Sequence, residues 1–344
     1  MQHEIVGSGP LLDARGELSQ TGWARQPWRD ANVECVRGIA GHFGARFRIK
    51  RWDYYGIWTP ELFVSATLAQ LSYVGLVFFY VVELATGKCV EHGITRLLGR
   101  GIHLPRNSDA GDASYDDGRT RALFHLAPGL RRLDASDPGF DGGRGLRIKV
   151  DLTCSPQHDS IVVATPMGAG RFYYNRKING LPARGSVLWG DHIIRVPAEH
   201  SLGQLDWGCG VWPYRSHWTW ASANGFLEDA RVVGLNLGGG FGDLSRATEN
   251  AIFINGRLHK LGQVGFDFDA RDYRRAWRMN DDADRLEIEF QPVTERTARI
   301  NLGVIRSEVH QVFGAYTGRV VADDGEVIQL RGLPGFAEEH YARW

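Results

Sequence analysis

The sequence predicts an all-β protein, on the basis of its composition, its alternating apolar runs and its turn signals. The 344 residues include 43 Gly, 11 Trp, 11 Tyr and 16 Phe, but only 3 Met. Aromatic residues favour strands and glycine favours turns, so this composition indicates many connected strands. Short runs of alternating apolar and polar residues follow one another with turn-forming residues between them. We therefore expect antiparallel barrels or sandwiches with few short helices.

Strands are predicted along the whole chain by these alternating runs. In order, they lie at 45–52, 62–84, 146–152, 160–165, 171–174, 231–237, 251–254, 286–290, 299–302 and 326–330. Within the second run, the apolar stretch 71–84 is interpreted as a buried strand pair bent near Gly75. Asn179-Gly180, Asn255-Gly256 and Asp324-Gly325 signal hairpins, because type I′ turns need positive φ. The best candidates for short helices are 18–32 and 335–344.

The length predicts two domains, because single cores stop growing at roughly 250–300 residues. We place a β-barrel-like domain with long surface loops at residues 1–200 and a second β domain at 201–344, just before an aromatic segment. The surface loops are the Asp- and Gly-rich segments 106–120 and 134–145.

Charge and apolar length exclude several classes of partner. With 40 Lys+Arg and 40 Asp+Glu, the net charge is +0, which argues against nucleic acid and anionic membranes. The most apolar stretch, 71–84, has only 14 residues, whereas a membrane helix needs about 20. The first residues contain no signal-peptide pattern, so a cytoplasmic protein without a membrane span is expected. The four cysteines are scattered and show no metal-binding spacing, which predicts neither zinc nor a disulfide framework.

The segment 205–225 holds the densest group of candidate functional residues. It contains Trp207, Trp212, Trp218 and Trp220, and four tryptophans are more than one strand needs for packing. Rigid rings of this kind often line a ligand cavity, although any one Trp is more often part of a core. If 216–222 is a strand, Trp218 and Trp220 share one face and His217 points to the other. Asp206, Tyr214 and His217 are the candidate catalytic groups of this segment.

A second block, 233–254, runs from a strand through a glycine-rich loop into another strand. The loop lacks the Lys-Ser/Thr and the GxGxxG spacing of phosphate-binding motifs, so nucleotide binding is not expected. Glu249 begins a mostly apolar strand, where burial would raise its pKa and let it act as an acid. The competing interpretation is a solvated glutamate at a strand end. Asn236 and Asn250 are candidate ligand-binding residues beside it.

Two further segments add candidate ligand-binding residues. Asn175 and Lys177 follow the aromatic run that begins at Phe172, and His310 and Tyr316 lie in the segment 307–319. A histidine in an alternating strand is more often a satisfied polar residue than a catalyst. No GxSxG elbow and no HExxH motif is present, so neither a serine hydrolase of that type nor a zinc protease is indicated. We expect no cofactor and no metal.

The motifs YYNRKING, LDWGCGVWPYRSHWTWAS, GLNLGGGFGD to ATENAIF and LPGFAEEHYARW resemble a bacterial and protist family known as a conserved domain of unknown function. The resemblance covers nearly the whole chain, except that the family pattern has Arg at the position of Cys209. That family is in turn similar to the carotenoid 1,2-hydratase group. The similarity rests on an Asp-containing loop before a Trp-x-Trp strand, here Asp206 and Trp218/Trp220. It implies two lipocalin-like β-barrels with an apolar cavity near their junction.

The resemblance implies a lyase, hydratase, isomerase or cyclase that acts on an isoprenoid- or lipid-like substrate without a cofactor. Asp206 or Glu249 would be the acid, Trp212, Trp218 and Trp220 would face the developing positive charge, and Tyr214 or His217 would relay protons. A non-catalytic binder of hydrophobic ligands and a carbohydrate-active protein remain as alternatives. The expected partner is a small apolar ligand, and the expected state is a monomer or homodimer.

Overall fold

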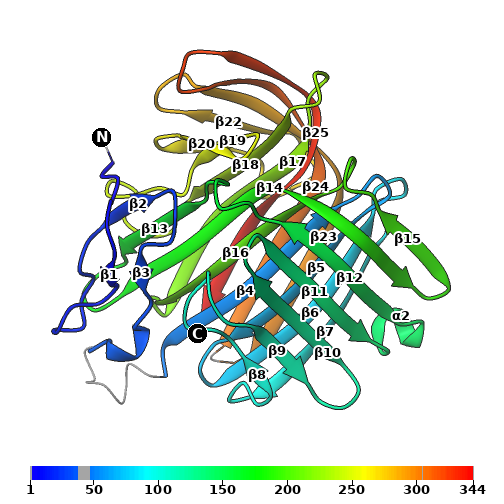
Figure 1. Ribbon diagram of the computed structural model, residues 1–344, viewed down its shortest axis with the longest axis horizontal. Helices are drawn as coiled ribbons and strands as arrows, with labels where there is room; N and C mark the ends of the chain where they lie inside the picture. The colour runs from blue at the N-terminus through cyan, green and yellow to red at the C-terminus, as the bar shows by residue number, and fades with distance from the viewer. Residues whose placement is uncertain (1, 38–46, 304, 344) are drawn as a thin grey trace.

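The protein is built from two antiparallel sheets that curl into half-barrels and pack against each other (Figure 1). The structure, a computed structural model, describes residues 2–37, 47–303 and 305–343. Within these residues, the helical elements are the turn η1 (Val33–Cys35) and the four-residue α2 (Phe140–Gly143). The all-β, two-part prediction is confirmed. The first residues of the predicted strand 45–52 and the last residue of the predicted helix 335–344 lie outside the described residues.

The described residues form a large sheet of 14 strands from the first part of the chain. Its continuous order is β7 (Cys89–Leu97), β6 (Val74–Glu83), β5 (Leu62–Gln70), β4 (Ile49–Trp58), β16 (Leu202–Val211), β14 (Phe172–Trp189), β12 (Leu146–Thr153), β11 (Leu130–Asp137), β10 (Arg121–Ala127), β9 (Ala113–Asp116) and β8 (Ile102–His103). β14 also pairs with β13 (Ile161–Pro166) and β15 (His192–Val196), and β13 pairs with β2 (Gly22–Ala24). Outside this sheet, β1 (Gly9–Pro10) and β3 (Arg29–Asp30) form a small parallel pair.

The second sheet has nine strands among the described residues. Its order is β20 (Arg257–Lys260), β19 (Ala251–Ile254), β18 (Val232–Gly239), β17 (Arg215–Phe226), β25 (Val327–Arg343), β24 (Ile305–Val321), β23 (Leu286–Leu302), β22 (Trp277–Asp281) and β21 (Val264–Asp267). The chain changes sheet between Val211 and Arg215, later than the predicted boundary at 200/201, because β16 pairs with both β4 and β14.

Two of the three predicted hairpin turns are present. Asn255 and Gly256 both have positive φ and join β19 to β20, and Gly325 lies in the turn between β24 and β25. Asn179-Gly180 instead forms a bulge inside β14. There the Asn179 side chain donates to Ser222 Oγ at 2.8 Å and to Leu235 O at 3.0 Å, which ties β14 to the second sheet. The predicted bend at Gly75 is a tight turn at residues 71–73, where Ser72 has positive φ.

Both predicted helices are wrong. Residues 18–32 contain β2, β3 and turns, and 335–343 are the end of β25, which pairs with β17 and β24. These contacts across two neighbouring strands override the local helical pattern of the C-terminal segment.

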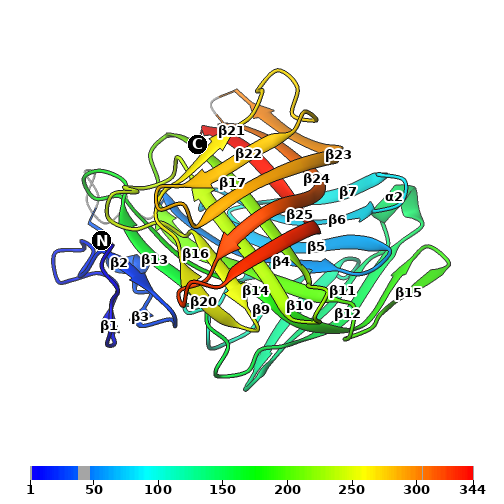
Figure 2. The same cartoon turned by 90° about the horizontal axis from the view of Figure 1, so that it is seen from above.

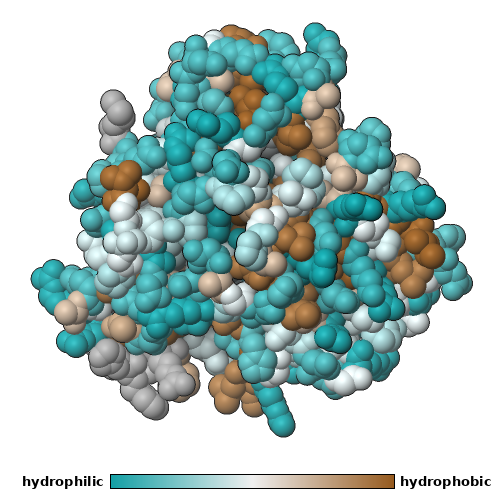
Figure 3. Space-filling view, in the orientation of Figure 1, coloured by the Kyte–Doolittle hydropathy of each residue, from teal (hydrophilic) through white to brown (hydrophobic). Residues whose placement is uncertain are grey.

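The two sheets meet along their concave faces. Viewed from above, β4–β7 lie beside β23–β25 (Figure 2). A cluster of buried rings joins them, with Tyr54, Phe63 and Tyr80 from the large sheet against Phe313 and Phe336 from the second. The face shown in Figure 3 is largely hydrophilic, with hydrophobic residues in small groups. The large hydrophobic clusters of the two sheets are made of buried residues.

Candidate functional site

A cavity of about 630 Å³ lies between the two sheets. Its walls come from β4–β7, β13, β14 and β16 on one side and from β17, β18 and β23–β25 on the other. The aromatic rings that line it are Trp52, Tyr54, Phe78, Tyr80, Tyr173, Trp212, Trp218, Trp220 and Phe241. A mostly apolar cavity of this volume suits an organic ligand of drug-like size.

One wall carries two acidic side chains that share a single ammonium group. Lys177 Nζ lies 3.0 Å from Glu249 Oε1 and 3.7 Å from Asp206 Oδ2. The same nitrogen lies 3.9 Å from the centre of the Trp220 ring, a cation–π contact. All four side chains line the cavity, and Lys177 is buried. The group brings one basic and two acidic side chains together in a largely apolar environment.

Asp206 is positioned by neighbouring strands of the large sheet. Its Oδ1 accepts hydrogen bonds from Trp52 Nε1 at 3.0 Å and from Asn175 Nδ2 at 2.9 Å. Trp52 lies on β4 and Asn175 on β14, the two strands that flank β16. Burial raises the pKa of Asp206, and the charge of Glu249 raises it further, against the opposing effects of Lys177 and the two hydrogen bonds. Asp206 is therefore a carboxyl group with an increased tendency to hold a proton.

Glu249 is held from both sheets. Its Oε2 accepts a hydrogen bond from the Tyr173 hydroxyl at 3.0 Å, and Gly238 on β18 packs directly against its carboxylate. Behind it, Asn236 receives the Trp220 indole N–H at 2.8 Å and donates to the Glu249 carbonyl at 2.8 Å. The Asn236 side chain therefore connects the backbone of Glu249 to the Trp220 indole.

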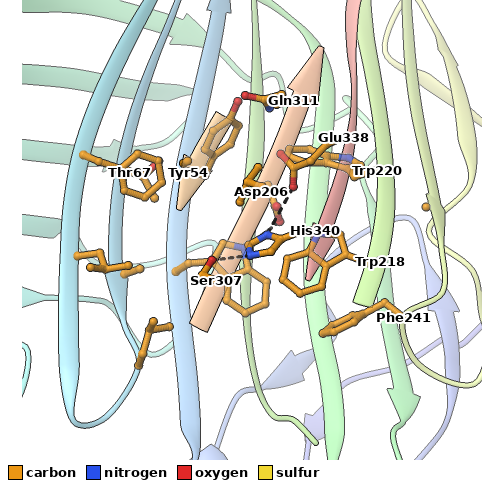
Figure 4. Close-up of a pocket in the computed structure, with 18 of the residues that line it drawn as sticks. Tyr54, Thr67, Asp206, Trp218, Trp220, Phe241, Ser307, Gln311, Glu338 and His340 are labelled. Carbon is orange, nitrogen blue, oxygen red and sulfur yellow. Dashed lines mark hydrogen bonds and ion pairs between the residues drawn. The ribbon is translucent and has the colours of Figure 1, made fainter. Parts of the chain in front are cut away.

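The wall formed by β24 and β25 carries a second polar group. Ser307 Oγ lies 2.8 Å from His340 Nε2, and His340 Nδ1 lies 3.8 Å from Glu338 Oε1 (Figure 4). The imidazole of His340 packs on Trp218 with ring centres 4.0 Å apart. Beside this group, the buried Arg296 makes two contacts with Glu91, at 2.9 and 3.0 Å.

The structure brings most of the sequence candidates together. Lys177, Asp206, Trp212, Trp218, Trp220 and Glu249 all line the cavity. Asn175, Asn236 and Asn250 are buried one layer behind it. Asn175 contacts Asp206, Asn236 contacts Trp220, and Asn250 Oδ1 accepts the Gly238 N–H at 2.6 Å. The three asparagines therefore position wall residues instead of lining the cavity.

Four candidates lie away from the cavity. Tyr214 is 41% exposed in the connection between β16 and β17. His217 is on the opposite face of β17 from Trp218, where it contacts Glu339 at 3.0 Å. His310 likewise faces away from the cavity on β24 and contacts Glu295 at 2.6 Å. Tyr316 is buried in the core of the second sheet, and its hydroxyl donates to Phe336 O. The alternation of side chains along each strand separates His217 and His310 from the wall.

Several wall residues were not identified from the sequence. They are Trp52, Tyr54, Tyr173, Arg296, Ser307, Glu338 and His340. A signal for Trp52 was available, because it ends the predicted strand 45–52. Tyr54 lies beyond that range and shares the face of Trp52 because β4 continues to Trp58. Glu338 and His340 were missed because their segment was interpreted as a helix.

Within residues 2–37, 47–303 and 305–343, no three His, Cys, Asp or Glu side chains are grouped in a way that would hold a metal ion. No helix in that part of the chain is long and apolar enough to cross a membrane.

Comparisons with solved structures show several similar folds. A protein from Nitrosomonas europaea described as AttH is 16% identical, with a TM-score of 0.51, over 85% of this chain and 92% of that chain. CghA, in its structure with Sch210972, is 9% identical, with a TM-score of 0.53, over 86% of this chain and 88% of that chain. Kievitone hydratase from Nectria haematococca is 10% identical, with a TM-score of 0.49, over 86% and 88%. The first two similarities establish a shared fold.

A comparison with proteins of curated function gave no match. The profile of the family described as a domain of unknown function (DUF2804) matches residues 2–344. This match confirms the family resemblance that the sequence motifs indicate. The chain therefore belongs to the DUF2804 family.

Proposed function

We propose that this protein is a lyase, hydratase, isomerase or cyclase that protonates an apolar, isoprenoid- or lipid-like substrate in the cavity. The observation that supports the proposal most strongly is the position of Asp206 and Glu249, which share Lys177 on a wall lined by tryptophans. Protonation of a carbon atom needs a neutral carboxylic acid shielded from water, and burial favours that form.

Asp206 is the proton donor in this proposal. Asp206 and Glu249 together carry one more negative charge than Lys177 neutralises, and low polarity disfavours the excess. A proton taken up by one of the two carboxyl groups removes this excess negative charge. The hydrogen bonds from Trp52 and Asn175 occupy Oδ1, so the proton belongs on Oδ2. Glu249 lies beside the Lys177 nitrogen and accepts the hydrogen bond of the Tyr173 hydroxyl.

The aromatic walls supply the second requirement of this chemistry. Adding a proton to a double bond leaves a positive charge on carbon, and ring faces stabilise such a charge. Trp212, Trp218 and Trp220 lie on the cavity wall beside Phe241, with Trp212 and Trp218 5.8 Å apart. Water capture of the cation gives hydration, proton loss gives isomerisation, and attack by a second double bond gives cyclisation.

The experiment uses an organic-solvent extract of the source cells, because it contains the apolar compounds that the protein meets. The extract is incubated with wild-type protein, Asp206→Asn and Glu249→Gln, and is compared by liquid chromatography and mass spectrometry. We expect wild-type protein to convert a compound to one of equal mass or one that differs by a water. Asp206→Asn should lower the rate by about 100-fold or more. Full activity in both variants would contradict the assignment of the acid.

A non-catalytic binder of hydrophobic ligands is the second candidate, favoured by the mostly apolar lining of the cavity. CghA, which shares the fold, was solved with the ligand Sch210972. This candidate predicts that native mass spectrometry of purified protein shows a retained lipid and that incubation returns it unchanged. The carbohydrate-active alternative needs two carboxylates that face each other across a groove. Here Lys177 occupies the space between the two carboxylates, which disfavours it.

A further inference from the structure

A second set of groups suited to proton transfer lies on the wall of the second sheet. Glu338 and His340 are two residues apart on β25 and therefore point to the same face, into the cavity. Ser307 on the neighbouring β24 contacts His340 Nε2 at 2.8 Å, and Glu338 lies 3.8 Å from His340 Nδ1 (Figure 4). The imidazole thus has a hydroxyl at one nitrogen and a carboxylate near the other.

The surroundings of His340 favour its neutral form. Burial lowers the pKa of His340 from its usual value of 6.5. The contact with Glu338 opposes this change, whereas the charges of Arg296 on β23 and of His217, on the far face of β17, reinforce it. A neutral imidazole at neutral pH is a proton acceptor, and the Ser307 hydroxyl beside Nε2 provides a relay for the proton.

The same three residues are poorly suited to nucleophilic catalysis by serine. That chemistry needs backbone or side-chain N–H donors to stabilise an oxyanion. Ser307 lies in an interior strand, opposite Ile300 on β23 and Ala342 on β25. The backbone N–H groups of such a strand are used in the sheet, so they are not available at the serine. Proton transfer is the chemistry that this geometry supports.

Two tryptophans of β17 lie between the group of Ser307, Glu338 and His340 and the group of Lys177 and Asp206. His340 packs on Trp218, and the Lys177 ammonium group packs on Trp220. Trp218 and Trp220 are successive residues on one face of the strand, so they are separated by about 7 Å. This spacing places a proton donor and a proton acceptor at two points of one medium-sized substrate.

We propose that His340, oriented by Ser307 and Glu338, is the proton acceptor of a second proton-transfer site in the cavity. Its substrate is a hydrocarbon-rich molecule that carries a double bond or a tertiary alcohol, and this inference rests on the proposed function. In cyclisation, Asp206 gives its proton to one double bond, a second double bond attacks the resulting cation, and the new cation loses a proton from an adjacent carbon to His340. In hydration, the attacking water gives its proton to Ser307 as the Ser307 proton passes to His340. Exchange with solvent then returns a proton to Asp206 and removes one from His340.

The test measures proton removal alone and needs no knowledge of the natural substrate. The probe is 2-decalone, an apolar ketone whose α-hydrogens exchange with deuterium when a base removes them. Protein and ketone are incubated in D2O buffer near neutral pH, and deuterium in the ketone is measured by mass spectrometry. Wild-type protein should exchange at least about 10-fold faster than buffer, and His340→Gln should lose that gain.

Three further variants make the result specific. His310→Gln is the matched control, because His310 lies three residues from Ser307 on β24 but faces away from the cavity, and it should exchange like wild type. Ser307→Ala and Glu338→Gln keep the imidazole and should lower exchange partially. If circular dichroism shows that His340→Gln is not folded, Ser307→Ala and Glu338→Gln provide the test instead. Exchange at the wild-type rate in both of these variants would contradict the proposal.

Other outcomes would also overturn the proposal. They are failure of wild-type protein to accelerate exchange, wild-type exchange in folded His340→Gln, and covalent labelling of Ser307 by an alkyl fluorophosphonate. The result is separable from the proposed function. Loss of substrate conversion in Asp206→Asn together with unchanged exchange in His340→Gln would leave the acid assignment standing and remove only this inference.

Discussion

Lys177 and Trp220 come from different sheets and are in direct contact, with the ammonium nitrogen 3.9 Å from the centre of the indole ring. Lys177 is on β14 of the large sheet, and Trp220 is on β17 of the second. Because Lys177 also contacts Asp206 and Glu249, this pair joins the candidate acids to the aromatic wall. The wall that carries the candidate acids and Trp220 is therefore formed only when the two sheets pack together.

Replacement of Lys177 by Met should destabilise the protein. The change removes the basic group that two largely buried carboxyl groups share, so we expect the free energy of unfolding at neutral pH to fall by about 3 kcal/mol. Urea denaturation followed by circular dichroism measures this. The control is Lys149→Met, because Lys149 is exposed on β12, and it should change stability by no more than about 0.5 kcal/mol. Equal stability of the two variants would show that Lys177 does not neutralise the carboxylates.

A methyl group at Gly238 should displace the carboxylate of Glu249. A Cβ there would overlap the Glu249 side chain, so Gly238→Ala should move it away from Lys177. A shift of about 1 Å in a catalytic group can lower turnover by about 100-fold. The extract assay of substrate conversion measures the effect. Gly265→Ala is the control, since its Cβ would meet Asn280 at an ordinary 3.5 Å. Normal turnover in Gly238→Ala would argue that the position of Glu249 is unimportant.

The ion pair between Arg296 and Glu91 should hold the two sheets together at the other end of the cavity. It joins β23 to β7 through contacts of 2.9 and 3.0 Å. Glu91→Gln leaves the buried guanidinium group without this counter-charge and should lower the free energy of unfolding by about 2 kcal/mol. Thermal denaturation tests this against Glu228→Gln, whose ion pair with Arg331 is exposed. An identical midpoint in both variants would contradict the role given to Glu91.

The buried carboxyl group of Asp53 should make stability depend on pH. Burial raises the pKa of Asp53 from 3.8 to about 7, although Arg131 opposes the change. Its contribution to stability is therefore complete below pH 3.8 and is lost as the pH rises through about 7. Relative to wild type, Asp53→Asn should gain stability across this window, by up to about 4 kcal/mol. Urea midpoints of both proteins at several pH values measure the gain. A stability difference between the two proteins that does not change with pH would contradict the raised pKa of Asp53.

Local patterns predicted those features that depend on nearby residues. The alternation of apolar side chains was sufficient for the all-β class, and the positive φ values at Asn255 and Gly256 follow from the turn type. The Trp218/Trp220 face of β17 was also predictable, because period-two alternation is a property of a single strand.

Features that depend on distant pairing could not be predicted in the same way. Glu338 and His340 share a face only if 335–343 is a strand, and that conformation is stabilised by β17 and β24 on either side. Asn179-Gly180 carries a hairpin signal, yet the contact of Asn179 with Ser222 keeps it inside β14. The contact between Lys177 and Trp220 likewise requires the packing of two sheets, which one-dimensional patterns do not encode.

The most direct test of the account is the deuterium content of the product formed in D2O. If Asp206 protonates the substrate, wild-type protein should place solvent deuterium on carbon in each turnover, and Asp206→Asn should do so about 100-fold more slowly. Incorporation by Asp206→Asn at the wild-type rate, in a variant that is folded and binds the substrate, would contradict the central claim.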